Sequence, residues 1–386
     1  MVYYILDNYA IITSEEKMQQ FIAKIFKSSD KYLLCISSLL SVFGMIVISS
    51  ATYSMGNVKF VIVQLAAYLI GFVCMAALTV IDFESFGNKT GFIYAFNILL
   101  LTVVLFLGTG DEVGTRGWRR FGPVGIQPAE IVKIGYILTL AKHVSRNERH
   151  INSLFPFMGL AFHAAVIIGM VLLQPDYGTA MVYMFIFICM IFASGLYYRA
   201  ILAAIAAFAA FMPVAWFFIL QPFQKNRILT FINPELDPSG AGYHVIQSKI
   251  AIGSGGLFGR GLYNGPQTQL EILPEKHTDF IFAVIGEELG FIACIAVIAL
   301  LFALVIRCFV IASKCRSKYG KYICIGVGAM ILFQTFENVG MCIGVMPVTG
   351  IPLPFISYGG SSMITNMIGM GLVMSVAARQ QTINFR

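Results

Sequence analysis

The sequence predicts an all-α polytopic membrane protein with about ten transmembrane helices and a large extracytoplasmic loop between helices 7 and 8. Of its 386 residues, 58% are hydrophobic and only 12% are charged, and its mean hydropathy is +0.81. A soluble fold has no place for so much apolar surface. The few charges also argue against a large soluble domain, so cytosolic enzymes and nucleic-acid binders are excluded.

The ten helices are predicted from ten apolar runs, each near the length of about 20 residues that spans a bilayer. A polar stretch precedes the first run, so residues 1–30 are predicted to form a cytoplasmic segment, either an interfacial helix or a solvated lead-in. The membrane domain then occupies residues 31–380, and residues 381–386 form a tail. The runs cover residues 32–53, 58–81, 92–108, 128–143, 155–173, 178–194, 200–220, 279–305, 322–345 and 358–378.

The distribution of Lys and Arg over the loops predicts the orientation. With the N-terminus inside, sixteen of the 26 basic residues fall in cytoplasmic segments, and the other ten lie mostly in two unusual outward loops. Short cytoplasmic loops carry an excess of Lys and Arg. Both termini are therefore predicted to be cytoplasmic, and the net charge of +7 is attributed to these loops rather than to a nucleic-acid partner.

Two outward segments depart from a plain bundle. Residues 109–127 form the first, and the second, residues 221–278, is long and rich in Pro and Gly. Loops of this length are either functional or disordered. Order is favoured for the second, because its apolar stretch Val245–Ile252 contains Gln247 and Lys249 and fits an amphipathic or re-entrant helix.

Several kinds of site find no support in the sequence. The eight cysteines contain no C-x-x-C pair, and the five histidines contain no H-E-x-x-H motif. A disulfide framework and a dedicated zinc site are therefore not expected. No P-loop or dinucleotide fingerprint occurs in a suitable context, so no nucleotide cofactor is expected.

Ionisable residues at membrane depth are costly, so they mark the first candidates for chemistry. Glu130 and Lys133 open the fourth run and lie three residues apart, close enough to touch on one helix face. This pair fits a helix-end anchor as well as a substrate or proton role. Asp279 follows His277 at the mouth of the eighth run, where it fits a helix N-cap or a general base whose pKa is raised towards neutrality.

Two further clusters face outward. Arg116, Trp118 and Arg119 oppose the positive-inside bias, so they fit a clamp for phosphate or pyrophosphate as well as a solvated loop. The segment 347–362 has three prolines and several small residues. It is predicted to be a rigid loop, in which hydroxyls such as that of Ser357 either face an anion or serve packing. Glu337 and Asn338 add a polar pair within the ninth run.

Five motifs occur in order along the chain. They are Gln127-Pro-Ala-Glu130-x-x-Lys133, Gln174-Pro-Asp-Tyr-Gly-Thr179, Gly242-Tyr-x-x-x-Gln-Ser-Lys-Ile-Ala-Ile-Gly-Ser-Gly-Gly256, Leu273-Pro-Glu-Lys-His-Thr-Asp279 and Met346-Pro-Val-Thr-Gly-Ile-Pro-Leu-Pro354. Taken together, these motifs resemble the SEDS family of bacterial cell-wall proteins, over roughly residues 30–380. The sequence of residues 346–354 is similar to the RodA branch rather than to the division branch, FtsW.

The resemblance implies a ten-span peptidoglycan glycosyltransferase of the bacterial cytoplasmic membrane that polymerises lipid II for rod-shape elongation. It implies a class B penicillin-binding protein, a transpeptidase, as partner, together with other membrane proteins of the elongation complex. Asp279 matches the essential aspartate of the family, and Glu130 and Lys133 match the polar pair of the same cavity. Gly117 stands where the family often has a basic residue, so the sequence does not select between Arg116 and Arg119 as the pyrophosphate contact.

The chemistry of that reaction assigns a role to each candidate. Asp279 is predicted to be the general base, and Lys133, held in place by Glu130, is predicted to stabilise the leaving pyrophosphate together with Arg116, Arg119 or Lys276. The other predicted substrate-binding residues are Trp118, His277 and Ser357. No cofactor is required by the sequence, although a divalent cation, Mg²⁺ or Mn²⁺, with Asp279 among its ligands is compatible with it. Two alternatives stay open at this stage: a lipid II transporter and a membrane scaffold for a transpeptidase.

Overall fold

The ten apolar runs coincide with ten helices in a computed structural model, which describes residues 30–108, 119–121, 124–219, 225, 229–237 and 240–383. The predicted segment 1–30 therefore lies, apart from its last residue, outside the described residues. The helices that match the runs are α2 (Lys31–Ala51), α3 (Lys59–Val80), α5 (Thr90–Leu107), α6 (Pro128–Asn147), α7 (Leu154–Leu172), α8 (Tyr177–Ala193), α9 (Tyr198–Val214), α13 (Ile281–Lys314), α14 (Lys318–Ile343) and α15 (Gly360–Ile383).

Shorter elements connect these helices. Among the described residues, the loop predicted over 221–278 holds a 3-10 turn and two helices, and α11 contains the stretch expected to form an amphipathic or re-entrant helix. The fold is not purely helical, because β1 and β2 pair as an antiparallel hairpin in the first outward loop, which the sequence did not predict. These elements are α4 (Glu84–Gly87), β1 (Arg119–Phe121), β2 (Val124–Ile126), η1 (Glu148–His150), η2 (Ala215–Ile219), η3 (Pro234–Leu236), α11 (Ala241–Ser254) and α12 (Pro266–Gln269).

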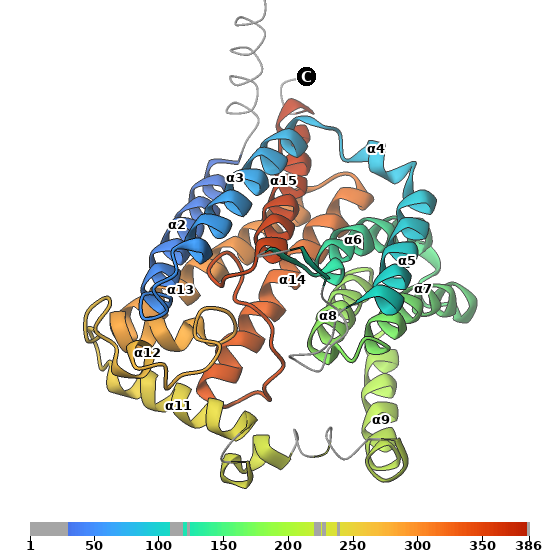
Figure 1. Cartoon of the computed structure of the whole chain (residues 1–386). Helices are drawn as coiled ribbons and strands as arrows, with labels where there is room; N and C mark the ends of the chain where they lie inside the picture. Colours follow the sequence, from blue (N-terminus) through green and yellow to red (C-terminus); the bar gives the residue numbers. More distant parts are fainter. Residues whose placement is uncertain are drawn as a thin grey trace, which may run out of the picture.

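Helices α6, α14 and α15 form the middle of the bundle (Figure 1). Helices α2, α3 and α13 lie on one side of them, and α5, α7 and α8 lie on the other (Figure 1). Burial follows this arrangement: 78% of the apolar window of α14 and 83% of that of α15 are buried, against 22% for α3 and 28% for α7. The outer helices therefore expose apolar side chains around the bundle, as expected where lipid covers them.

Six helices of the described part are long and apolar enough to cross a membrane: α2, α3, α7, α13, α14 and α15. Two shorter apolar helices, within α5 and α8, accompany them. A polytopic membrane protein is thus supported by length and composition.

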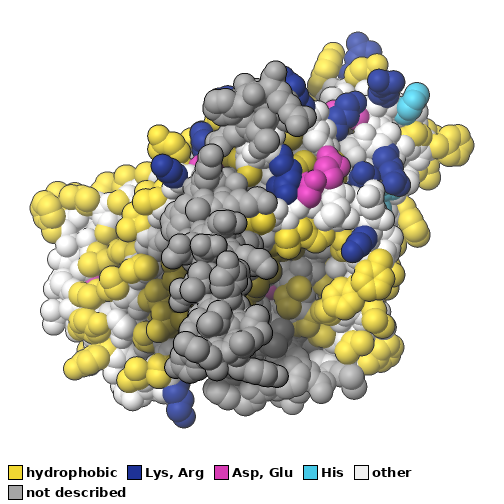
Figure 2. All heavy atoms as spheres, turned by 90° about the horizontal axis from the view of Figure 1, so that it is seen from above, with side chains coloured by type: hydrophobic (Ala, Val, Ile, Leu, Met, Phe, Trp, Pro, Cys, Tyr) yellow, Lys and Arg dark blue, Asp and Glu magenta, His cyan; other side chains and the backbone are white. Residues whose placement is uncertain are grey.

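The bundle has two unlike ends. We call the end that carries α11 and α12 the α11 end, and the opposite end, which carries α4, the α4 end (Figure 1). Figure 2 looks onto the α4 end and shows Lys and Arg side chains gathered on one part of it, among few acidic ones.

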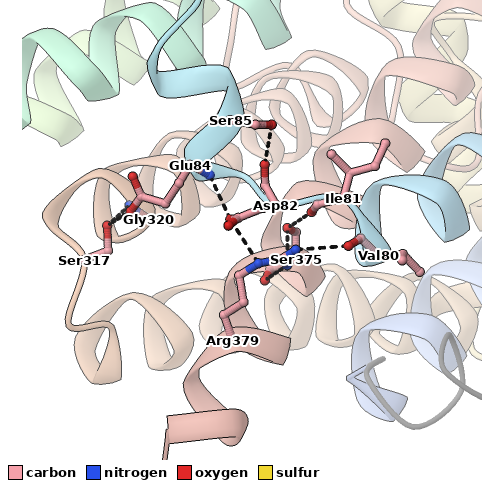
Figure 3. Close-up of polar contacts among 9 residues, drawn as sticks. All are labelled: Val80, Ile81, Asp82, Glu84, Ser85, Ser317, Gly320, Ser375 and Arg379. Atoms are coloured by element: carbon pink, nitrogen blue, oxygen red, sulfur yellow. Dashed lines mark hydrogen bonds and ion pairs between the residues drawn. The ribbon is translucent and has the colours of Figure 1, made fainter.

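A polar network ties four segments together at the α4 end (Figure 3). Arg379 of α15 donates to the carbonyl oxygen of Val80 at 3.0 Å and pairs with Asp82 at 3.0 Å. Asp82 accepts from the backbone nitrogen of Glu84, and the Glu84 carboxylate accepts from Ser317 at the start of α14. These contacts hold the ends of α3, α14 and α15 around α4.

Candidate functional site

Asp279 lies at the α11 end, in the turn of residues 274–280 that precedes α13. Its carbonyl oxygen accepts hydrogen bonds from Asn338 Nδ2 at 2.7 Å and from Cys342 Sγ at 3.7 Å. A Cβ atom built on Gly350 would lie 3.3 Å from Asp279 Oδ2. The half-buried carboxylate therefore faces the Pro-rich loop of residues 347–359, beside the end of α14.

The surroundings of Asp279 favour its protonated form. Burial, followed by the negative charges of Glu275 and Asp176, raises the pKa of Asp279 to about 7. Asp176 caps α8 by accepting from the backbone nitrogen of Thr179 at 3.0 Å, and it accepts from Gln127 Nε2 at 2.7 Å. A carboxylate poised near neutral pH suits general acid–base chemistry.

Glu130 and Lys133 form the ion pair that their spacing predicts. Lys133 Nζ lies 2.6 Å from Glu130 Oε1, and both side chains are almost completely buried. Pro128 begins the helix, as expected at a first helical position. Glu130 Oε2 is buried and has no hydrogen-bond partner among the described residues, so within them the pair leaves one acceptor for water or a ligand.

Gln127 connects this pair to neighbouring helices. Its side chain binds Asp176 at the start of α8, and its backbone nitrogen donates to Ser361 Oγ of α15 at 3.2 Å. The start of α6 thus meets α8 and α15 at the α11 end. Asp176 is the link between the Glu130–Lys133 pair and Asp279, because it binds Gln127 and acts on the Asp279 carboxyl through its charge.

The Lys276 side chain links the loop to the end of α2. Its Nζ donates to Ser54 Oγ and to the carbonyl oxygen of Thr268, both at 2.7 Å. The side chain is 1% exposed, and burial lowers its pKa, although the charges of Glu271 and Glu288 act in the opposite direction. The ammonium group therefore holds the loop against the end of α2, and its predicted contact with pyrophosphate stays a prediction.

His277 and Ser357 both anchor the Pro-rich loop. The ring of His277 packs against Phe60 at 4.8 Å and against Tyr358 at 5.6 Å, and its carbonyl oxygen accepts from Tyr358 N at 2.9 Å. Burial lowers the pKa of His277, which favours a neutral ring. Ser357 Oγ accepts from Leu353 N at 2.8 Å. Substrate contacts of either residue stay predictions.

The predicted outward clamp falls largely outside the described residues. Arg116 and Trp118 lie there, and so does the side chain of Arg119, whose backbone pairs with Ile126 in the hairpin. No group of three or more His, Cys, Asp or Glu in the described chain is placed to hold a metal ion.

Two buried amides complete the site and were not assigned a role from the sequence. Gln64 of α3 donates to the carbonyl oxygen of Ser357 at 3.1 Å and accepts from Gly359 N at 3.1 Å. Asn338 donates to the carbonyl oxygens of Asp279 and Ile351. Both are 0% exposed. The only sequence signal was their polarity within apolar runs.

Comparison with protein families places nearly the whole chain in one family model. Residues 30–382 match the FtsW/RodA/SpoVE model, described as cell cycle protein. The peptidoglycan glycosyltransferase MrdB of Escherichia coli is 38% identical, over 91% of this chain and 94% of its own length. The peptidoglycan glycosyltransferase RodA of Treponema pallidum is 34% identical, over 90% and 97%.

Solved structures give the same result for the fold. A chain from a peptidoglycan synthase complex, reported for its structural coordination of polymerization and crosslinking, superposes with a TM-score of 0.78 at 33% identity and covers 91% of this chain and 98% of its own. The rod shape determining protein RodA of Thermus thermophilus superposes with a TM-score of 0.68 at 29% identity and covers 90% and 96%.

Proposed function

Since the chain belongs to the FtsW/RodA/SpoVE family, we propose that Asp279 is the general base with which it extends glycan strands from lipid II. The chain is a peptidoglycan glycosyltransferase. The observation that carries the assignment is the Asp279 carboxylate itself, which is half-buried, faces the Pro-rich loop, and has a pKa raised to about 7.

In the proposed step, Asp279 takes the proton of the acceptor sugar hydroxyl. The hydroxyl oxygen forms a bond to the anomeric carbon of the donor, while the bond from that carbon to the pyrophosphate oxygen breaks and its electron pair leaves with the pyrophosphate. The donor linkage is α and the product linkage is β, so a single displacement with inversion accounts for the product. No covalent intermediate is needed.

The leaving pyrophosphate requires positive charge. Lys133, oriented by Glu130, is proposed to supply part of it, and Arg116 or Arg119 of the first outward loop is proposed to supply the rest. Mg²⁺ is usually held by one or two carboxylates together with substrate phosphates, so Asp279 and a bound pyrophosphate are compatible with a divalent cation. The proton transfer to Asp279 does not depend on it.

The proposed topology has ten spans with both termini in the cytoplasm. It is supported by the ten helices at the ten apolar runs and by the bias of Lys and Arg. The α11 end then faces outward, where lipid II presents its sugar. For partners, we propose a class B penicillin-binding protein, since a superposing chain belongs to a complex that couples polymerization to crosslinking. Rod-shape elongation, with further membrane proteins of that complex, is proposed as the setting.

The first test is polymerisation of labelled lipid II by the purified protein, with and without its transpeptidase. We expect Asp279→Asn to lower the polymerisation rate by about 10²–10⁴-fold, the usual contribution of general base catalysis. The exposed loop carboxylate Glu235 provides a matched control, and Glu235→Gln should polymerise at the wild-type rate.

Folding is checked by thermal unfolding at pH 8. Asp279 is ionised at that pH although its surroundings favour the protonated form, so its raised pKa costs stability that the amide avoids. Asp279→Asn should therefore be at least as stable as the wild type. Wild-type polymerisation by the folded variant would rule out Asp279 as the base, and a wild-type protein that moves lipid II but never polymerises it would support a transporter.

A further inference from the structure

We propose that Asn338 is a positioning residue for this reaction, because its side-chain amide fixes Asp279 against the Pro-rich loop. The inference rests on the proposed role of Asp279 as base.

Asn338 lies within α14 and is completely buried. Its Nδ2 atom donates to the carbonyl oxygen of Asp279 at 2.7 Å and to that of Ile351 at 2.8 Å. An amide nitrogen carries two N–H bonds, so both are used. One reaches the turn before α13 and the other reaches the loop that follows α14. One side chain therefore joins the turn before α13 to the Pro-rich loop.

The contacts around Asn338 leave little room for an alternative position of Asp279. Ile351 is held by its hydrogen bond from Asn338. The preceding residue, Gly350, has φ +75° and lies against the Asp279 carboxylate. On its other side, Thr349 Oγ1 donates to Glu337 Oε1 at 2.9 Å. Residues 337 and 338 of α14 thus hold two successive parts of the loop segment that faces the base.

The Asn338 amide bonds to backbone carbonyl oxygens, so its removal should displace the turn that carries Asp279 and lower kcat. The two carbonyl oxygens lose their buried donor if the amide is removed, and the turn is then free to move relative to the loop. A misplacement of about 1 Å is enough to lower a rate by about 10²-fold. Substrate binding, to which further residues are proposed to contribute, should change much less.

The experiment compares Asn338→Ala and Asn338→Asp with wild type in lipid II polymerisation. Both variants remove the two N–H donors, and Asn338→Asp keeps the shape of the side chain. We expect kcat to fall by about 10- to 100-fold and KM to change by less than about threefold. Thr335→Val is the matched control, because the Thr335 hydroxyl donates to Ile331 O of its own helix, at 2.7 Å, and not to the turn or the Pro-rich loop. It should retain the wild-type kcat.

A comparison of the two variants separates positioning from a general loss of structure. The new carboxyl group of Asn338→Asp is completely buried and faces two carbonyl oxygens. It is therefore expected to be protonated and to keep one O–H donor, whereas Asn338→Ala keeps none. Asn338→Asp should retain a higher kcat than Asn338→Ala, and an equal kcat of the two folded variants would contradict the positioning role.

Asp279→Asn, measured in parallel, separates this inference from the proposed function. If Asp279→Asn is inactive while both folded Asn338 variants keep kcat within about twofold of wild type, the positioning role is wrong and the base stands. If Asp279→Asn polymerises normally, the proposed base fails first. If neither Asn338 variant folds, as judged by thermal unfolding, Asn338 is a requirement of the fold, and its role as a positioning residue is rejected.

Discussion

The pKa of Asp279 is set by contributions from two parts of the chain that are distant in sequence. Its own burial is the largest cause, and the charges of Glu275 in the same turn and Asp176 at the start of α8 follow. Both charges act in the same direction as burial. Removing either charge therefore shifts the balance towards the ionised form.

Glu275→Gln tests this account directly. The substitution removes a negative charge, so the pKa of Asp279 should fall and more of the base should be ionised at pH 6. We expect the acidic limb of the polymerisation rate to move to lower pH, and the ratio of the rate at pH 6 to that at pH 8 to rise by about two- to threefold, as fits a partly solvated charge.

Glu271→Gln is the control for this measurement. Glu271 is also an exposed loop carboxylate, but its charge is not among the causes of the Asp279 shift. The acidic limb of the pH–rate profile of Glu271→Gln should stay at the wild-type pH. A limb that moves to higher pH in Glu275→Gln, or that moves equally in both variants, would contradict the electrostatic account.

Residue type decides which members of the site could be found from the sequence. Asp279, Glu130 and Lys133 are charged groups next to apolar runs, and such groups are rare enough to be noticed. Gln64 and Asn338 are neutral amides whose partners are backbone groups of other segments. Gln64 bonds to Ser357, which is distant in sequence, and Asn338 bonds to Asp279 and to Ile351. Periodicity and spacing carry no signal for that kind of contact, so the roles of Gln64 and Asn338 were not predicted.

At the scale of elements, helix α13 is interrupted at Gly290. This residue has φ 80°, and the backbone groups freed by the interruption pair with the Gly-rich segment 255–261. Arg260 N donates to Glu287 O at 3.0 Å, and Phe291 N donates to Gly256 O at 2.9 Å. The sequence predicted one continuous run over 279–305, because the segment that replaces the helical hydrogen bonds lies some thirty residues earlier.

Gly290→Ala should therefore destabilise the protein. A Cβ atom at this position would lie 2.3 Å from Gly259 N, and the left-handed conformation is strained for Ala. We expect a loss of about 1–3 kcal/mol, measured by thermal unfolding in detergent. Gly253→Ala in α11 is the matched control, since no atom of the described residues lies within 4 Å of its added Cβ atom. An equal effect of both substitutions would show that the close approach at Gly290 is unimportant.

At the scale of the whole molecule, the two ends of the bundle differ in what their polar groups do. At the α11 end, buried side chains are directed at the turn and loop around Asp279. Several of them, Glu130 and Glu337 included, keep a polar atom that has no partner in the described part of the chain. At the α4 end, the network of Figure 3 uses its polar groups to join helix ends. The proposed catalytic groups and the contacts that join helix ends thus lie at opposite ends of the bundle.

This separation predicts a variant that weakens the fold but not the chemistry. Arg379→Met removes the contacts with Val80 O and Asp82 and leaves the end of α3 without its donor. Hydrogen bonds to charged groups contribute about 1.5–3 kcal/mol each, and exposed ion pairs much less, so we expect a net loss of about 1–2 kcal/mol. Thermal unfolding should show the loss, while kcat, KM and the acidic limb of the folded enzyme stay at wild-type values. A shifted limb would mean that the α4 end is coupled to Asp279 through the central helices, and the two ends would then have to be treated as one cooperative unit.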